Sequence, residues 1–169
     1  MKHLKKFLAV ALVCVMALTV LTGCGKSAKT YSSEVASKLG ANSGVAVNET
    51  TTKSAEKLIS GVKKIGIPEL VKLAQDPENA EAIAETILKD AGLNMETDEF
   101  AIAASGYGQK VMLTTMGSEP VQEGDASTYF ANAIKNYNAK DYNEKKLTKY
   151  GIATYSVLGV DIVVLVAQY

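Results

Sequence analysis

The residue of this chain best suited to covalent chemistry is Cys24, and the residues before it give the thiol its context. Three lysines stand among the first six residues, and residues 7–20 form an apolar run broken by a single threonine. Thr22 and Gly23 are small and leave the thiol uncrowded. A positive start, a short apolar core and small residues before a cleavage point are typical of a secretory signal. The run is shorter than the roughly 20 residues of a membrane span, so we expect a cleaved signal over residues 1–23.

The sequence Leu21-Thr22-Gly23-Cys24 resembles the lipobox of bacterial lipoproteins. In that family a diacylglyceryl group is attached to the cysteine thiol, and a peptidase cuts just before the cysteine. The resemblance implies lipid attachment at Cys24 and a lipid-anchored location on the extracytoplasmic face of the cell membrane. An ordinary secretory peptide with an incidental cysteine is the alternative.

Composition excludes several functions for the rest of the chain, which has 169 residues in all. Residues 1–23 hold three of the 18 lysines and no acid, so the remainder sets 15 lysines against 18 carboxylates, a formal charge of −3. A mildly acidic chain does not suit nucleic acid, whose binding depends on neutralising phosphates. We therefore expect no nucleic-acid partner.

The missing residue types restrict the chemistry further. The chain has no arginine, and its only histidine, His3, lies in the predicted signal with Cys14. The usual proton shuttle near neutral pH and the usual ligands of zinc are thus absent beyond Cys24. The acids of residues 78–99 lack the spacing of a calcium-binding loop, and Gly106-Tyr107-Gly108 lacks the rest of a phosphate loop. We expect no catalytic residues, no metal site and no cofactor.

Tyrosines and lysines gather in the last quarter of the chain, around a polar stretch at residues 139–146. Tyrosines with lysines bind sugars or peptides by stacking and hydrogen bonding, and loops beside rigid elements often carry function. The residues that we predict to bind a ligand are Tyr137, Lys140, Tyr142 and Lys145. The alternative is that the tyrosines pack inside while the lysines keep the surface soluble.

Helices and strands that would position these residues follow from apolar periodicity. Residues 24–52 are rich in Ser, Thr, Gly, Asn and Lys, which predicts a flexible tether with room for a short helix near residues 33–39. Apolar stripes predict helices over 53–65 and 77–91, ended by Gly66 and Gly92. Alternation within residues 100–104 and 111–115 predicts one or two strands with a glycine turn between them. Asp125 can cap a helix over 126–138.

The chain closes with two predicted strands, over residues 149–157 and 160–168. Residues 162–167 are apolar on both faces, which is typical of a central strand covered on both sides. A second membrane anchor is the competing interpretation, but Asp161 interrupts a run that is already too short. We therefore expect a core strand.

The stretch over residues 53–169 resembles the CAP superfamily, which is named for cysteine-rich secretory proteins, antigen 5 and pathogenesis-related proteins. The segments that carry the resemblance, in the family's order, are residues 66–70 (GIPEL), 89–93 (KDAGL), 99–103 (EFAIA), 132–136 (NAIKN) and 149–153 (KYGIA). The resemblance implies an α+β fold: a three-layer α-β-α sandwich with a small, mainly antiparallel sheet that ends in a C-terminal hairpin.

The chain departs from the CAP family where members with a metal-binding cleft place two histidines and two acids. It offers no histidine there, and residues 137–141 (YNAKD) stand in place of a histidine-containing stretch. We expect a membrane-anchored lipoprotein whose non-catalytic domain binds an envelope protein, peptide or glycan, or serves a structural role. The alternative is a carboxylate-based envelope hydrolase, because paired acids can cleave glycosides.

Overall fold

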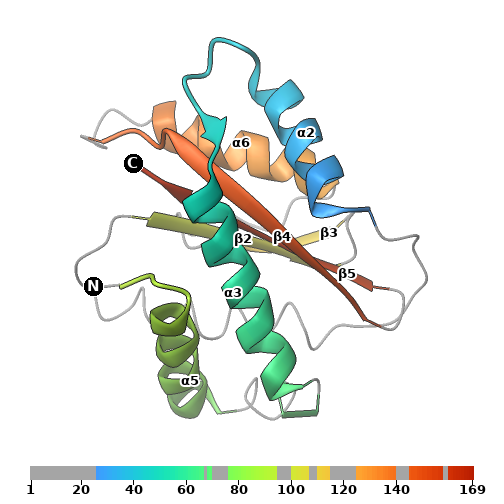
Figure 1. Ribbon diagram of the computed structural model, residues 1–169, viewed down its shortest axis with the longest axis vertical. Helices are drawn as coiled ribbons and strands as arrows, with labels where there is room; N and C mark the ends of the chain where they lie inside the picture. The colour runs from blue at the N-terminus through green and yellow to red at the C-terminus, as the bar shows by residue number, and fades with distance from the viewer. Residues whose placement is uncertain are drawn as a thin grey trace.

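The computed structural model describes residues 26–66, 68–69, 76–94, 100–106, 110–114, 125–139, 145–157 and 160–169. These residues form an α+β fold (Figure 1). In chain order the elements are α2 (Ala28–Leu39), β1 (Ala46–Val47), α3 (Glu49–Ile65), α5 (Pro77–Asp90), β2 (Phe100–Gly106), β3 (Lys110–Thr114), α6 (Ala126–Ala139), β4 (Lys149–Val157) and β5 (Val160–Gln168). The predicted order of two helices, one or two strands, a helix and a final strand pair is confirmed, with two strands, β2 and β3, in the middle region.

The strands form one sheet with the order β1-β4-β5-β2-β3. The short β1 runs parallel to β4, and the other neighbours are antiparallel. β5 lies in the middle of the sheet, paired with β4 on one side and β2 on the other. Residues 162–167 are at most 1% exposed. The prediction of a central strand covered on both faces is therefore confirmed.

Helices lie on both faces of this sheet. One face carries a core in which Phe130 and Ile134 of α6 and Val35 of α2 cluster with Val163 and Leu165 of β5. Because side chains alternate along a strand, Val164 and Val166 face the opposite side, where α3 crosses the sheet (Figure 1). α5 packs on α3, with Ile87 against the bare backbone of Gly61. The sheet is thus enclosed between two helical layers.

The N-terminus of α3 fixes how this helix meets the sheet. The side chain of Asn48 accepts hydrogen bonds from the backbone N–H groups of Thr50 (2.9 Å) and Thr51 (3.3 Å), which makes it the helix cap. The helix consequently begins four residues before the predicted start at residue 53. On β4, a Cβ atom added to Gly151 would lie 2.1 Å from the backbone nitrogen of Thr52. Glycine at this position lets the helix backbone contact the strand directly.

The predicted tether over residues 24–52 is wrong for residues 28–52, which contain α2, β1 and the start of α3. Tyr31, Val35 and Leu39 are buried, and they belong to the core formed with α6 and β5. These side chains recur every four residues and so share one helical face. Three serines, Glu34 and Lys38 stand between them and make this apolar stripe hard to recognise in the sequence. The folded domain therefore begins well before residue 53.

The remaining helix boundaries follow the predicted capping residues. The side chain of Asp76 accepts a hydrogen bond from the backbone N–H of Asn79 (3.3 Å), with Pro77 in the first turn of α5. Asp125 caps α6 in the same way through the N–H of Thr128 (2.8 Å). Gly66 and Gly92, with φ angles of 77° and 78°, adopt the left-handed conformation that glycine favours after a helix.

Candidate functional site

Two tyrosines meet where α6 ends and β5 ends. Tyr137, near the end of α6, and Tyr169, just after β5, hydrogen-bond through their hydroxyl groups. Their ring centroids lie 6.0 Å apart with the rings inclined at 52°. Both side chains are half-buried and pack against the core shared by α2, α6 and the sheet. The two side chains are thus packed on the core and remain partly accessible to solvent.

Asn138 of α6 forms two hydrogen bonds with Leu147, in the segment that leads into β4. Its amide group donates to the carbonyl of Leu147 (2.9 Å), and its side-chain oxygen accepts from the N–H of the same residue (2.8 Å). Leu147 is buried, whereas Lys145 and Lys146 just before it are exposed. We call the set Tyr137, Asn138, Lys145, Lys146 and Tyr169 the tyrosine junction. It combines two half-buried aromatic rings with two exposed lysines that directly precede Leu147 in the chain.

The structure places two of the four predicted ligand-binding residues, Tyr137 and Lys145, in the tyrosine junction. Lys140 and Tyr142 lie outside the described residues. The proposed role of all four residues stays a prediction, since geometry alone does not show binding. Tyr169 adds a partner that its distance from Tyr137 in the sequence did not reveal.

Other tyrosines of the last quarter serve different purposes. Tyr129 and Tyr150 are buried in the core. The hydroxyl of Tyr150 donates to the carbonyl of Ser32 (2.9 Å), and burial raises its pKa to about 12. Tyr155 lies on the α3 side, with the ammonium of Lys63 4.5 Å from its ring centroid. For these three residues the interpretation of tyrosine as packing or surface support is the one that the contacts favour.

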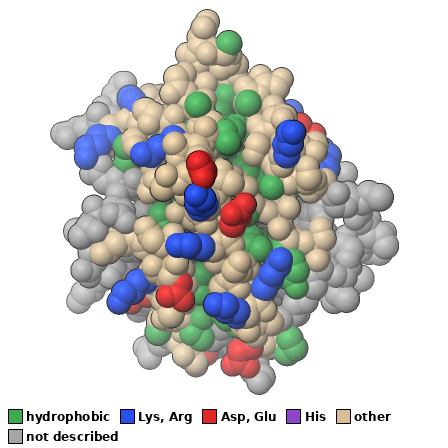
Figure 2. Space-filling model, in the orientation of Figure 1, with side chains coloured by type: hydrophobic (Ala, Val, Ile, Leu, Met, Phe, Trp, Pro, Cys, Tyr) green, Lys and Arg blue, Asp and Glu red, His purple; other side chains and the backbone are tan. Residues whose placement is uncertain are grey.

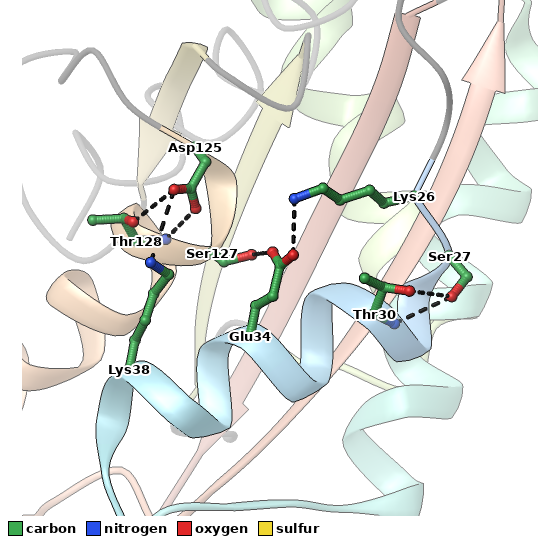
Figure 3. A network of polar contacts seen from close by, with 8 residues as sticks. All are labelled: Lys26, Ser27, Thr30, Glu34, Lys38, Asp125, Ser127 and Thr128. Atoms are coloured by element: carbon green, nitrogen blue, oxygen red, sulfur yellow. Dashed lines mark hydrogen bonds and ion pairs between the residues drawn. The ribbon is translucent and has the colours of Figure 1, made fainter.

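A second polar cluster, which sequence reasoning missed, joins α2 to the start of α6 (Figure 3). Glu34 accepts hydrogen bonds from the ammonium of Lys26 (2.8 Å) and the hydroxyl of Ser127 (2.5 Å). Asp125 accepts from the hydroxyl of Thr128 (2.8 Å) and forms an ion pair with Lys38 on α2 (3.9 Å). Glu34 and Ser127 are 93 residues apart in the chain, so no local pattern could have predicted their contact.

Serine, glutamate and lysine in contact could suggest a nucleophile with its base, but the geometry here opposes that chemistry. Ser127 is 0% exposed, so a substrate cannot reach its hydroxyl. The hydrogen bonds from Lys26 and Ser127 hold the pKa of Glu34 below its usual range, which makes this carboxylate a poorer base. Partial burial works to raise the pKa of Asp125, but the hydrogen bonds from Thr128 outweigh it and the net shift is downward. The cluster therefore acts as a clasp between two helices.

The face of the described residues over α3 carries mixed charge. Figure 2 shows Lys and Asp or Glu side chains interspersed on the face over α3, where Lys53 pairs with Glu49 at 2.6 Å. Among the described residues, no group of three or more His, Cys, Asp or Glu side chains is arranged to hold a metal ion. Within the same residues, no helix combines the length and the apolar character that crossing a membrane requires.

Comparison with known proteins adds no relative. No family model matches the sequence, and no match was found among curated proteins or among solved structures.

Proposed function

We propose that this protein is a bacterial lipoprotein, held on the extracytoplasmic face of the cell membrane by lipid on Cys24. The observation that carries the proposal is the sequence Leu21-Thr22-Gly23-Cys24, preceded by a positive start and a short apolar run. Two acyl chains give stable membrane attachment where one gives only marginal binding. The folded domain that follows would then work at the cell envelope.

The second part of the proposal is that the domain is a degenerate relative of the CAP fold. Its order of elements and its helices on both faces of an antiparallel hairpin agree with what the resemblance implies. Two of the resembling segments contain a glycine that the structure requires, one for its positive φ angle and one for a close backbone contact. The segment over residues 89–93 contains Gly92, which follows α5 in the left-handed conformation. The segment over residues 149–153 contains Gly151, where α3 contacts β4.

The tyrosine junction is the surface that we assign to ligand binding. Half-buried tyrosines bring flat apolar area and hydroxyl groups at low cost in conformational entropy. Lys145 and Lys146 beside them bring positive charge. Such a surface suits an envelope peptide, protein or glycan with acidic groups. Binding of this kind requires no catalytic residue.

The alternative, a carboxylate-based hydrolase, is less well supported by the described acids. Glycoside cleavage needs one carboxyl group with a raised pKa to serve as the acid. The described carboxyl groups of Glu34 and Asp125, which come from facing helices, both have lowered pKa values. Both are engaged in the clasp between α2 and α6. A binding role therefore agrees better with the chemistry of these side chains.

Two measurements on the full chain expressed in bacteria test the proposal. Mass spectrometry of membrane-bound protein should find a diacylglyceryl group on Cys24, and an unmodified thiol there would contradict the anchor.

For the binding role, a photo-crosslinking residue would replace Lys145, with the same residue at exposed Lys57 on α3 as the matched control. We expect discrete adducts with an envelope component at position 145 alone. Identical patterns at both positions would contradict a binding surface at the tyrosine junction.

A further inference from the structure

We infer that the first turn of α2 lies directly on the membrane surface, with the ammonium group of Lys29 toward lipid phosphate groups. The inference rests on the proposed lipid at Cys24 and deepens it. It concerns how the folded domain is seated on the bilayer, which the lipid alone does not determine. A long flexible tether would leave the domain free to turn, whereas a very short connection would not.

The covalent connection between Cys24 and the folded domain is short. Ser27 caps α2, and its hydroxyl accepts a hydrogen bond from the N–H of Thr30 (3.1 Å). Only Gly25 and Lys26 separate Cys24 from Ser27. Consecutive Cα atoms are 3.8 Å apart, so three steps span at most about 11 Å. A lipid on Cys24 therefore keeps the helix cap within about that distance of the lipid headgroups.

α2 cannot lengthen this connection without loss of core packing. Tyr31 and Val35 are buried, 2% and 0% exposed, so unwinding the helix would expose both. Glu34 ties the same helix to Ser127 of α6, and the carbonyl of Ser32 accepts the hydroxyl of Tyr150 on β4. The chain is thus part of the rigid domain from its first helical turn onward.

The chemistry of this turn suits a phosphate-rich surface. Lys26 and Lys29 are exposed, and the first turn of α2 contains no acid. The ammonium of Lys26 is paired with the carboxylate of Glu34 (2.8 Å) and lies 5.7 Å from the ring centroid of Tyr31, so Lys29 is the lysine that we direct toward the membrane. The N–H groups at a helix start add partial positive charge. Lysines next to an anionic membrane surface are attracted to its headgroups.

Lysine footprinting on vesicles tests the inference with the protein's own side chains. The full chain would be produced in bacteria, purified from the membrane and reconstituted into vesicles that contain phosphatidylglycerol. An amine-reactive ester then labels exposed lysines, and mass spectrometry measures each one. Relative to the same protein in detergent, labelling of Lys29 should fall by about threefold or more, because headgroups cover it. Lys89, exposed on α5, serves as the matched control and should keep its reactivity.

Several outcomes would overturn the inference. Unchanged labelling of Lys29, or an equal fall at Lys89, would show that the first turn of α2 does not face the membrane. Equal protection on purely zwitterionic vesicles would remove the role given to the ammonium group of Lys29. A Gly-Ser linker of about 15 residues between Gly25 and Lys26, with a reach of about 20 Å, should restore the labelling. If Lys29 remained fully protected from labelling in the linker variant, the short connection to Cys24 would not be the cause of the protection.

The same mass-spectrometry measurement distinguishes failure of this inference from failure of the proposed lipid anchor. If the peptide that contains Cys24 carries no lipid, the proposed function fails, whatever Lys29 shows. The thiol of Cys24 can then be coupled to a maleimide lipid in the vesicles, and the footprint repeated. If the labelling of Lys29 falls after chemical coupling, the placement of α2 on the membrane is supported independently of the natural lipid. If the labelling does not fall, that placement is overturned.

Discussion

At the scale of single residues, Gly151 decides how closely α3 approaches the sheet. A Cβ atom at this position would lie 2.1 Å from the nitrogen of Thr52 and 2.4 Å from its Cα. Backbone atoms cannot rotate away, so Gly151→Ala should separate α3 from β4 and lower the free energy of unfolding by about 3 kcal/mol or more. Chemical denaturation of the variant measures this change.

Gly61→Ala is the matched control for Gly151→Ala. Its added Cβ would lie 2.7 Å from Cγ2 of Ile87, a side-chain atom that a rotamer change can move. Alanine also favours the helix by about 1 kcal/mol over glycine. The free energy of unfolding should change by clearly less than in Gly151→Ala. Equal losses in the two variants would contradict the direct backbone contact between α3 and β4.

The clasp around Glu34 predicts a dependence of stability on pH. Lys26 and Ser127 hold the pKa of Glu34 below its ordinary value of 4.5. A lowered carboxyl pKa contributes stability above the ordinary value, and this contribution disappears as the pH falls through the lowered pKa. Glu34→Gln should therefore cost about 0.5–1 kcal/mol at pH 7 and progressively less below pH 4.5. Chemical denaturation at a series of pH values measures this cost, and Glu56→Gln, at an exposed position on α3, is the control. A cost that does not shrink in acid would refute the role of the charged carboxylate.

At the scale of elements, the sequence predicted those whose burial pattern is local and missed those that depend on distant partners. The apolar run at residues 162–167 and the capping residues Asp76 and Asp125 identified their elements directly. For α2 the sequence allowed only a short helix near residues 33–39 within a tether, because only Tyr31, Val35 and Leu39 mark its buried face among mostly polar neighbours. The junction of Tyr137 with Tyr169 depends on where α6 and β5 end in space, which no local spacing encodes.

The central position of β5 leads to a prediction about Val164. This side chain is 0% exposed, and the chain contains no arginine to pair with a buried acid. Val164→Asp should cost several kcal/mol, a large share of a typical stability of about 5–15 kcal/mol. Lys145→Asp, at an exposed position before β4, should change stability by no more than about 0.5 kcal/mol. If the two variants unfolded at the same denaturant concentration, β5 would not be the core of the sheet.

At the scale of the whole molecule, the lipid and the tyrosine junction would be separated by the length of α6. Ser127, which contacts Glu34 of α2, and Tyr137 lie ten residues apart on this helix, about 15 Å along its axis. A ligand at the tyrosine junction would thus be held away from the anchored end of α2. The domain would present its binding surface at a fixed distance from the anchor.

Replacement of the anchoring thiol gives a prediction for the whole protein. Cys24→Ser removes the only atom to which a diacylglyceryl group can be attached by a thioether, so the variant should leave the membrane fraction or stay unprocessed. Cell fractionation followed by mass determination distinguishes the two results. Thr22→Ser, which keeps a small residue before the cysteine, is the control and should remain lipid-anchored. A processed Cys24→Ser protein that stays in the membrane fraction would contradict a thiol-linked lipid.

The middle strand of the sheet, β5, is also the last element in chain order. Until it is present, β1 can pair only with β4 and β2 only with β3, so the sheet exists as two unconnected pairs. Pairings between distant segments form slowly. A chain threaded through a membrane pore from its N-terminus would thus stay unfolded until β5 had crossed. The position of one strand in the sequence would then delay assembly of the sheet until that strand has crossed.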